Sequence, residues 1–400
     1  MPYSKPLSYP TTQSVIKNLN AGIRIELSRT CRSIRLFEKR LPLKINHLHL
    51  EPYSITIDDV RFTMDVVKCS KSQEHQSVTS TYPSIEMSPG DIFIESPVRP
   101  GTMIGSTDYA QWRMKLIKLE SQNDYEKNQG EIDNLRDVLL PYDLIRVGTE
   151  NFSYGIRLTV KRFEKTFWQE KMAYNDKFHL AMKYLMTKIL MGRSDMVQVN
   201  QLNINPRLEN CCFRTPSGLK MRVQKLIITK NTLTVLDAFA LVIDESSYPF
   251  KQIEIARGEN SRRQYNHPVI QTAEKLVITG TVYSEDIIAL THPRVHFNQV
   301  RSLYHEFFEE FRIRFSVGPR AIGSHFSFSL QNRMIAGTLL QMFESQESVV
   351  VPSNTMFGKT IVHKFWDGTT ELIIYCKQDG AKRGKHEKFP TIHFKLQSQN

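Results

Sequence analysis

A few short stretches of the chain hold residue types that bind phosphate or metal, but each lacks a partner at the required spacing. Gly358–Thr360 has the ending of a phosphate-binding loop, yet Ser353 stands where that loop needs its first glycine. His305 and Glu306 begin like the helix of a zinc protease, but Glu309 occupies the position of the second histidine. The spacing therefore favours neither nucleotide binding nor a metal site.

The remaining candidates for nucleophilic or metal chemistry are also isolated. The chain contains no Gly-x-Ser-x-Gly sequence and no cysteine–histidine pair with a recognised local signature. His292, His296 and His305 are close in sequence, but their spacings of 4 and 9 cross a proline and a predicted strand. We interpret them as separate surface histidines. The sequence accordingly predicts a protein that is not an enzyme and that holds no cofactor and no metal.

The composition is that of a folded protein with a basic excess. The 400 residues include 53 Lys and Arg against 41 Asp and Glu, a net charge of +12, and this length allows two or three domains. A positive net charge favours association with acidic partners, but it does not indicate the fold. One local basic cluster, diluted by Asp379 and Glu387, comprises Lys377, Lys382, Arg383, Lys385 and Lys388. We interpret it as a solvated loop, so nucleic-acid binding is an alternative that the sequence favours less.

The cysteines and the apolar runs bear on the compartment. The five cysteines are an odd number and include no Cys-x-x-Cys pair, which argues against a disulfide framework or a zinc site and favours a reducing compartment. The first residues, Met1–Pro6, lack the basic and then apolar pattern of a signal peptide. No apolar run approaches the ~18 residues of a membrane helix. We predict a cytoplasmic or nuclear protein that does not contact a membrane.

Six short apolar triplets recur between Val199 and Leu330. They are Leu202–Ile204, Leu226–Ile228, Ile253–Ile255, Leu276–Ile278, Val295–Phe297 and Phe326–Phe328. Their first residues are 24, 27, 23, 19 and 31 positions apart, close to the roughly 20–29-residue period of leucine-rich repeats. Strands and helices that repeat in this way stack into a curved solenoid with a parallel sheet. We therefore predict an α/β fold, an irregular leucine-rich-repeat-like solenoid in which the triplets pair side by side.

The repeat phrase is degenerate, which leaves a second interpretation open. The asparagine expected three residues after the last apolar position occurs once, as Asn231 after Ile228. The alternative is an ordinary α/β domain with irregular strand spacing. We favour the solenoid, whose exposed sheet would bind a macromolecule rather than catalyse a reaction.

Changes in composition and periodicity divide the chain into four segments. Residues 1–42 contain short amphipathic helices, and residues 43–69 alternate as strands of a small β capping unit. Residues 70–108 are rich in Ser, Thr, Gln, Pro and Gly and are predicted to be a flexible linker or loop. Residues 109–400 form the repeat-like domain. Its longest helix is expected at about residues 166–191, and three strand-like runs follow residue 360.

The N-terminal helices resemble a degenerate F-box. The residues that carry the pattern are Leu7, Pro10, Val15, Ile16, Leu19, Ile23, Leu27, Cys31 and Arg32. The pattern departs from the usual one because two residues separate Leu7 from Pro10, where most F-boxes have the leucine and proline adjacent. Further segments are similar to the nematode F-box C family, which carries an F-box-associated domain: Leu41–Leu48, Ala181–Arg193, Ser247–Lys251, Val269–Leu276 and Ile322–Phe328.

This resemblance implies a non-catalytic substrate receptor of a cullin-type, SCF-like ubiquitin ligase. An F-box-like helical module would dock a Skp1-like adaptor of the cullin complex through Leu7, Pro10, Val15, Ile16, Leu19, Ile23 and Leu27. The repeat-like body would hold an unknown protein substrate. Its proximity to the partner enzymes would promote ubiquitin transfer without a catalytic residue in this chain. The alternatives are a scaffold protein that has lost adaptor docking and, less favoured, a basic nucleic-acid-binding protein.

Overall fold

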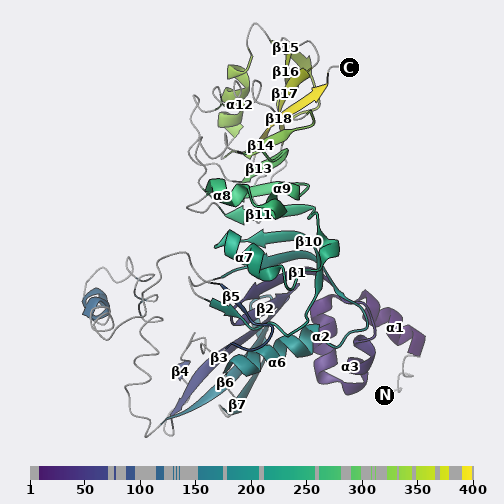
Figure 1. Ribbon diagram of the computed structural model, residues 1–400, viewed down its shortest axis with the longest axis vertical. Helices are drawn as coiled ribbons and strands as arrows, with labels where there is room; N and C mark the ends of the chain where they lie inside the picture. The colour runs from purple at the N-terminus through teal and green to yellow at the C-terminus, as the bar shows by residue number, and fades with distance from the viewer. Residues whose placement is uncertain are drawn as a thin grey trace, which may run out of the picture. The chain divides into compact units, whose positions relative to one another are not determined.

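A computed structural model describes most of the chain as two compact units (Figure 1). The described residues are 9–70, 76–77, 87–94, 114–120, 129, 132, 135, 152–173, 178–206, 211–256, 261–280, 290–298, 308, 311, 322–330, 333–344, 348–364, 370–377 and 390–398. Unit 1 comprises Met1–Arg222 and Ala238–Asp244, and unit 2 comprises Val223–Asp237 and Glu245–Asn400.

Unit 1 begins with three short helices: α1 (Tyr9–Asn18), α2 (Ala21–Thr30) and α3 (Arg32–Glu38). The Asn20 side chain accepts a hydrogen bond from the Gly22 backbone N–H at 2.8 Å and so caps the start of α2. A Cβ atom at Gly22 would lie 2.7 Å from the carbonyl oxygen of Ile57 and 2.7 Å from a methyl group of Val60. Glycine is therefore required where α2 packs directly on the strands of unit 1.

The main sheet of unit 1 is mostly antiparallel. In spatial order its strands are β8 (Val197–Ile204), β1 (Lys44–Glu51), β2 (Ser54–Ile57), β3 (Val60–Ser70), β6 (Phe152–Arg162) and β7 (Lys165–Ala173). Only the pair β8 and β1 is parallel. The smaller elements are β4 (Gln76–Ser77), which pairs with β3, the two-stranded sheet of β5 (Ile92–Ile94) and β9 (Cys211–Phe213), and helix α6 (Phe178–Leu190).

Unit 2 contains a parallel run of strands followed by an antiparallel one. The parallel strands are β10 (Met221–Ile228), β11 (Gln252–Ala256), β12 (Leu276–Thr279), β13 (Arg294–Asn298) and β14 (His325–Ser329). Next to β14 lie, in order and all antiparallel, β18 (Thr391–Ser398), β17 (Thr370–Lys377), β16 (Lys359–Lys364) and β15 (Ser348–Pro352). The helical elements are α7 (Thr232–Phe239), η1 (Glu245–Ser247), α8 (Ser261–Tyr265), α9 (Pro268–Thr272) and α12 (Arg333–Met342).

The predicted side-by-side pairing of the triplets is confirmed for the five that lie in unit 2. The first residues of neighbouring triplets are opposite one another in parallel ladders: Leu226, Ile253, Leu276, Val295 and Phe326. The apolar positions point into the core, where Phe297 and Phe328 stack with ring centroids 4.8 Å apart. Phe308, Phe311 and Phe394 surround this pair and are almost fully buried.

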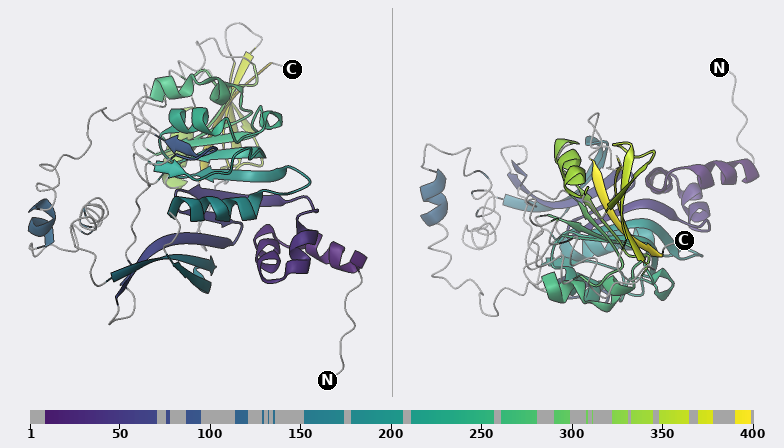
Figure 2. Two further views of the ribbon diagram at one scale, coloured as in Figure 1. Left: turned by 60° about the horizontal axis from the view of Figure 1, so that its bottom comes forward. Right: turned by 90° about the horizontal axis from the view of Figure 1, so that it is seen from above.

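The prediction of a leucine-rich-repeat-like solenoid with an F-box-like helical module is wrong. The described chain is dominated by mixed parallel and antiparallel sheet, and its helices are few. A leucine-rich-repeat solenoid continues one parallel sheet through all its repeats, whereas β14 is followed in the sheet by four antiparallel strands, β18, β17, β16 and β15. Figure 2 shows the ribbon from two further directions. Nor do α1 to α3 form a separate module, because α2 packs on the sheet of unit 1.

Two local predictions also need correction or qualification. The long helix expected at 166–191 is half wrong: Lys165–Ala173 is strand β7, paired with β6, and only Phe178–Leu190 is helical. In the predicted linker, 70–108, Ile92–Ile94 forms β5, and much of the rest lies outside the described residues. The three strand-like runs after residue 360 are confirmed as β16, β17 and β18.

Three further observations concern membrane-spanning helices, cysteines and groups of metal-binding side chains. Among the helices that the structure describes, none is long and apolar enough to cross a membrane. Cys31, Cys211, Cys212 and Cys376 are free thiols. Within the same described part of the chain, no group of three or more His, Cys, Asp or Glu side chains is arranged to hold a metal ion.

Candidate functional site

The strands of unit 2 present a polar face opposite their phenylalanine core. Because successive side chains of a strand point to opposite faces, the residues between the buried apolar ones gather on the other side of the sheet. The ladder register places them in two rows across β13, β14 and β18. One row is Arg294, His325 and Lys395, and the next row is His296, Ser327 and His393.

These rows line a groove of about 600 Å³. Its lining is Lys251, Glu274, Lys275, Arg294, Val295, His296, Gly323, His325, Ser327, Thr391, His393 and Lys395, all of unit 2. Four of these side chains are cationic and one is a carboxylate. A volume of this size is typical of ligand sites, and its charge favours an anionic ligand.

The charge of the groove lies at its rim and its neutral polar groups lie at its floor. Lys251, Lys275 and Arg294 are exposed. In contrast, Ser327, Thr391 and His393 have relative exposures of only 6%, 1% and 7%. A ligand that enters would therefore meet cations first and then find buried hydroxyl and imidazole groups that form hydrogen bonds.

Hydrogen bonds organise the floor of the groove. The Nε2 atom of His325 lies 3.0 Å from Nδ1 of His393, so one imidazole donates to the other. The Nδ1 atom of His296 lies 2.9 Å from the Ser327 hydroxyl, and its Nε2 atom lies 3.4 Å from the Ser329 hydroxyl. The hydroxyls of Ser329 and Thr391 are also 3.4 Å apart. These contacts link side chains of three neighbouring strands and hold the polar groups in place.

Burial, with a smaller contribution from nearby cations, keeps His325 and His393 of the groove neutral. Burial lowers the pKa of His393 to about 3, and His325, Lys377, His296 and Lys275 add to this shift. Burial also lowers the pKa of His325, with further contributions from Lys275, Lys395, Arg294 and Lys377. A hydrogen bond between two imidazoles requires that at least one ring is neutral, because one ring nitrogen must accept. The lowered pKa values therefore agree with the 3.0 Å contact between His325 Nε2 and His393 Nδ1.

The pKa of His393 predicts a loss of stability in mild acid. An unfolded imidazole binds a proton near pH 6.5, whereas the folded His393 does so only near pH 3, so below pH 6.5 the unfolded state binds more protons. From this group alone the free energy of unfolding should fall by about 2 kcal/mol between pH 7 and pH 5. Urea unfolding of the wild type and of His393→Gln at both pH values measures the difference. Identical pH dependence in the two proteins would contradict the assignment.

The pair His296 and Ser327 has the spacing of a base and a nucleophile but lacks the supporting groups. An imidazole that accepts the serine proton becomes a cation, and a triad stabilises that cation with a carboxylate. Here the other ring nitrogen of His296 faces the neutral hydroxyl of Ser329, and the lining of the groove already contains four cations. Ser327 lies within strand β14, where its backbone belongs to the ladder. This arrangement suits binding better than acyl transfer.

The residues predicted to dock an adaptor lie in different environments on the N-terminal helices. Leu7 lies outside the described residues. Pro10 and Val15 are exposed, Val15 by 46%, whereas Ile16 is buried at 3%. Leu19, Ile23 and Leu27 are half-buried. Only part of the predicted set is thus presented on the surface of unit 1.

Two of these residues face an apolar pocket of unit 1. The pocket has a volume of about 170 Å³ and is lined by Ile23, Glu26, Leu27, Thr30, Val60, Val160, Arg162 and Phe167. It therefore combines the α2 side chains with strands β3, β6 and β7. Ile23 and Leu27 turn toward the sheet of their own unit.

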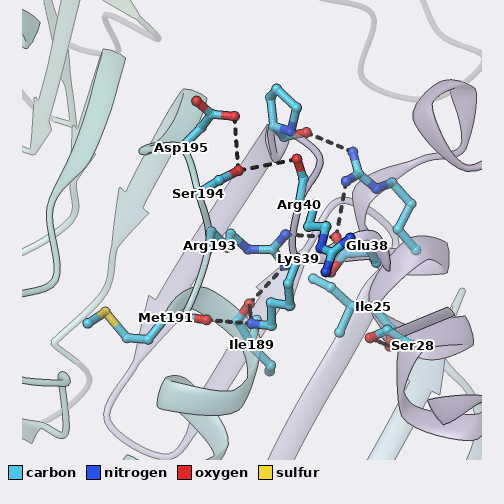
Figure 3. A network of polar contacts seen from close by, with 12 residues as sticks. Ile25, Ser28, Glu38, Lys39, Arg40, Ile189, Met191, Arg193, Ser194 and Asp195 are labelled. Carbon is cyan, nitrogen blue, oxygen red and sulfur yellow. Dashed lines mark hydrogen bonds and ion pairs between the residues drawn. The ribbon is translucent and has the colours of Figure 1, made fainter. Parts of the chain in front are cut away.

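A buried ionic network anchors the N-terminal helices to the rest of unit 1 (Figure 3). Glu38 Oε1 accepts from Arg24 at 3.1 Å and from Arg193 at 2.8 Å, and the three side chains have exposures of 0%, 3% and 2%. Arg24 also donates to the Pro42 carbonyl oxygen at 2.9 Å. Burial lowers the pKa of Arg24, and Glu38 opposes that shift. The network joins α2, α3 and the segment after α6.

Lys39 adds a second connection next to this network. Its ammonium group donates to the carbonyl oxygens of Lys188 at 2.8 Å and Met191 at 2.5 Å, at the end of α6. A cation at this position also interacts favourably with the helix dipole. Burial lowers the pKa of Lys39 to about 8, and the charge of Arg193 contributes. The contacts of Glu38 and Lys39 are structural and fix the position of α3.

The histidine assignments made from the sequence need correction. His292 is not a surface residue: it is 0% exposed, and its Nε2 atom lies 2.9 Å from the Ala273 carbonyl oxygen. His296 belongs to the groove, and His305 lies outside the described residues. In the segment that ends like a phosphate loop, Lys359 begins strand β16 and pairs with Glu344. Of the C-terminal basic cluster, only Lys377 is described.

The residues that precede the apolar triplets carry a sequence signal for the groove. The residues directly before the six triplets are Gln201, Lys225, Gln252, Lys275, Arg294 and His325. Their alternation with buried positions places them on the opposite face, and the last three line the groove. The polar middle residues His296 and Ser327 follow the same rule. The polar positions that alternate with the apolar ones therefore indicate this half of the site.

Comparison with known proteins adds one finding. A family model described as a domain of unknown function, DUF3557, matches residues 177–332. No curated protein and no solved structure matched the chain. The matched range includes β13 and β14 but ends before β18, so it covers only part of the lining of the groove.

Proposed function

We propose that the protein is a non-catalytic receptor that holds an acidic segment of a target protein in the groove of unit 2. The observation that carries this proposal is the arrangement of four cationic side chains around a floor of neutral, buried hydrogen-bonding groups. Carboxylates of a bound segment would pair with the rim, and its backbone or hydroxyl groups would bond to the floor. Charge complementarity of this kind provides specificity and fast association.

A protein segment suits the groove better than a nucleic acid. Proteins that bind single strands stack the bases on aromatic side chains, and the described residues that line this groove include no Phe, Tyr or Trp. Glu274 also belongs to the lining, and its carboxylate would repel a phosphate backbone. A segment with spaced acidic side chains can avoid Glu274 while it pairs with the cations.

Binding to an acidic probe tests this proposal directly. The full-length protein is titrated into the fluorescein-labelled peptide Gly-Glu-Glu-Gly-Ser-Gly-Glu-Glu-Gly, and fluorescence anisotropy is recorded at low and at physiological salt. We expect binding that weakens as salt rises, and no binding of the same peptide with lysine in place of glutamate. Absence of binding at low salt would reject the proposal. A stronger affinity for single-stranded RNA of equal charge would point to nucleic acid instead.

The resemblance to F-box proteins supports a second part of the proposal. In it, the N-terminal helices bind a Skp1-like adaptor of a cullin ligase, and the bound target is brought close to the ubiquitin-transferring enzymes. The exposed positions of the predicted set, Pro10 and Val15, are the available contacts. The free thiols suit the reducing conditions of the cytoplasm or the nucleus, where we propose that the protein acts.

Adaptor binding makes a specific prediction for helix α1. Val15→Glu should lower the affinity of the full-length protein for a purified Skp1-like adaptor by roughly tenfold or more, because a charge replaces an apolar contact. Gln13→Glu changes an exposed residue of the same helix and should have little effect. Isothermal titration measures both. If the wild type does not bind the adaptor, the protein is a receptor without ligase docking.

A further inference from the structure

The row Arg294, His325 and Lys395 places one cationic residue on each side of an imidazole within the groove. These residues lie on three adjacent strands and are directly opposite one another in the ladder. Adjacent strands are about 4.8 Å apart, so the long side chains on the two outer strands can both reach a group placed over the central one. His325 is that central residue, and it is half-buried.

Four cations of unit 2 also act on the imidazole of His325. The cations that act on its imidazole are Lys275, Lys395, Arg294 and Lys377, which extend from β17 to the start of β12. A single carboxylate of a ligand neutralises one charge. A group with two negative charges at one point satisfies several cations together, which favours it over separated carboxylates.

The neutral floor provides donors for a group with several acceptor oxygens. The imidazoles of His325 and His393 lie 3.0 Å apart, and Ser327 lies in the next row. The Arg294 guanidinium can form two parallel hydrogen bonds to one anionic group. A phosphate monoester carries about two negative charges and three strongly accepting oxygens, which matches this combination of cations, imidazoles and a hydroxyl group.

We propose that the segment bound in the groove carries a phosphorylated side chain, and that its phosphate lies over His325 between Arg294 and Lys395. This inference rests on the proposed binding of an acidic protein segment and names the group that the groove selects. The rest of the groove, which exceeds the size of one phosphate, accommodates the acidic residues on either side of the phosphorylated one.

Three peptides separate this inference from the proposed function. The first is the fluorescein-labelled peptide defined above, the second carries phosphoserine at its central position, and the third has two further glutamates in place of the glycines that flank its serine, which matches the charge of the phosphate. The full-length protein should bind the phosphoserine peptide about tenfold more tightly than the charge-matched glutamate peptide. Inorganic phosphate should compete more effectively with the phosphoserine peptide than sodium chloride of equal ionic strength.

A conservative variant tests the position of the phosphate. Arg294→Lys retains the charge but removes the planar pair of donors, so it should weaken binding of the phosphoserine peptide more than binding of the charge-matched glutamate peptide and thereby reduce the preference for phosphoserine. Arg333→Lys, on an exposed residue of α12 outside the lining, is the matched control. Equal affinities of the phosphoserine and the charge-matched peptides for the wild type would overturn the phosphate inference and leave the receptor proposal intact. Failure of every peptide to bind would overturn both.

Discussion

Replacement of Arg294 and Lys395 by glutamate should lower the affinity of the full-length protein for the acidic peptide by roughly 100-fold or more. Each cation contributes an ionic hydrogen bond of about 1.5–3 kcal/mol, and a change of 1.4 kcal/mol corresponds to a factor of ten. Reversal adds repulsion to this loss. Both residues belong to the row that centres on His325, so the change reverses two of the four cations that line the groove. Fluorescence anisotropy with the labelled peptide measures the effect.

A matched double variant controls for the change in net charge. Arg333→Glu with Lys364→Glu reverses the same two residue types at exposed positions of unit 2 that do not line the groove. This control should retain affinity within a few-fold of the wild type. Equal losses in the two double variants would show that attraction depends on overall charge and not on the groove. Circular dichroism of each variant confirms that the sheet is intact.

Replacement of Glu38 by glutamine should destabilise unit 1 by about 3–5 kcal/mol. The carboxylate of Glu38 is fully buried and accepts from both Arg24 and Arg193, so its neutralisation leaves two buried guanidinium groups without their shared counter-charge. The helices α2 and α3 are expected to separate from the sheet before the rest of the unit unfolds, because this network connects them to the segment after α6.

One tryptophan can report this separation. The guanidinium carbon of Arg29 on α2 lies 3.8 Å from the centroid of the Trp168 ring on β7, so Trp168 fluorescence senses the docking of α2. In a Trp112→Phe, Trp366→Phe background, urea unfolding of Glu38→Gln should begin at a clearly lower concentration. Glu26→Gln is the control: it removes a partly exposed pair with Arg29, which should contribute less than 1 kcal/mol. Coincident transitions for the two variants would contradict the structural role of Glu38.

Local periodicity predicted several elements correctly, and it failed where a partner strand decided the outcome. The predicted helix at 166–191 is correct over α6, whose side chains Phe178, Met182, Leu185 and Ile189 are spaced by three or four residues and are buried. The preceding segment, Lys165–Ala173, was expected to continue this helix. It is instead strand β7, because pairing with β6 satisfies its backbone groups. Propensity within one segment contains no information about such a partner.

The same distinction applies to the fold and to the groove. The alternating triplets determined that their apolar side chains share one face, because the side-chain period of a strand is two residues, and this predicted the ladder from β10 to β14. The antiparallel position of β18 next to β14 came only from the tertiary structure. It brings His393 to within 3.0 Å of His325 across 68 residues of sequence. Lys395 completes the row in the same way, since hydrogen bonding between strand edges does not depend on sequence separation.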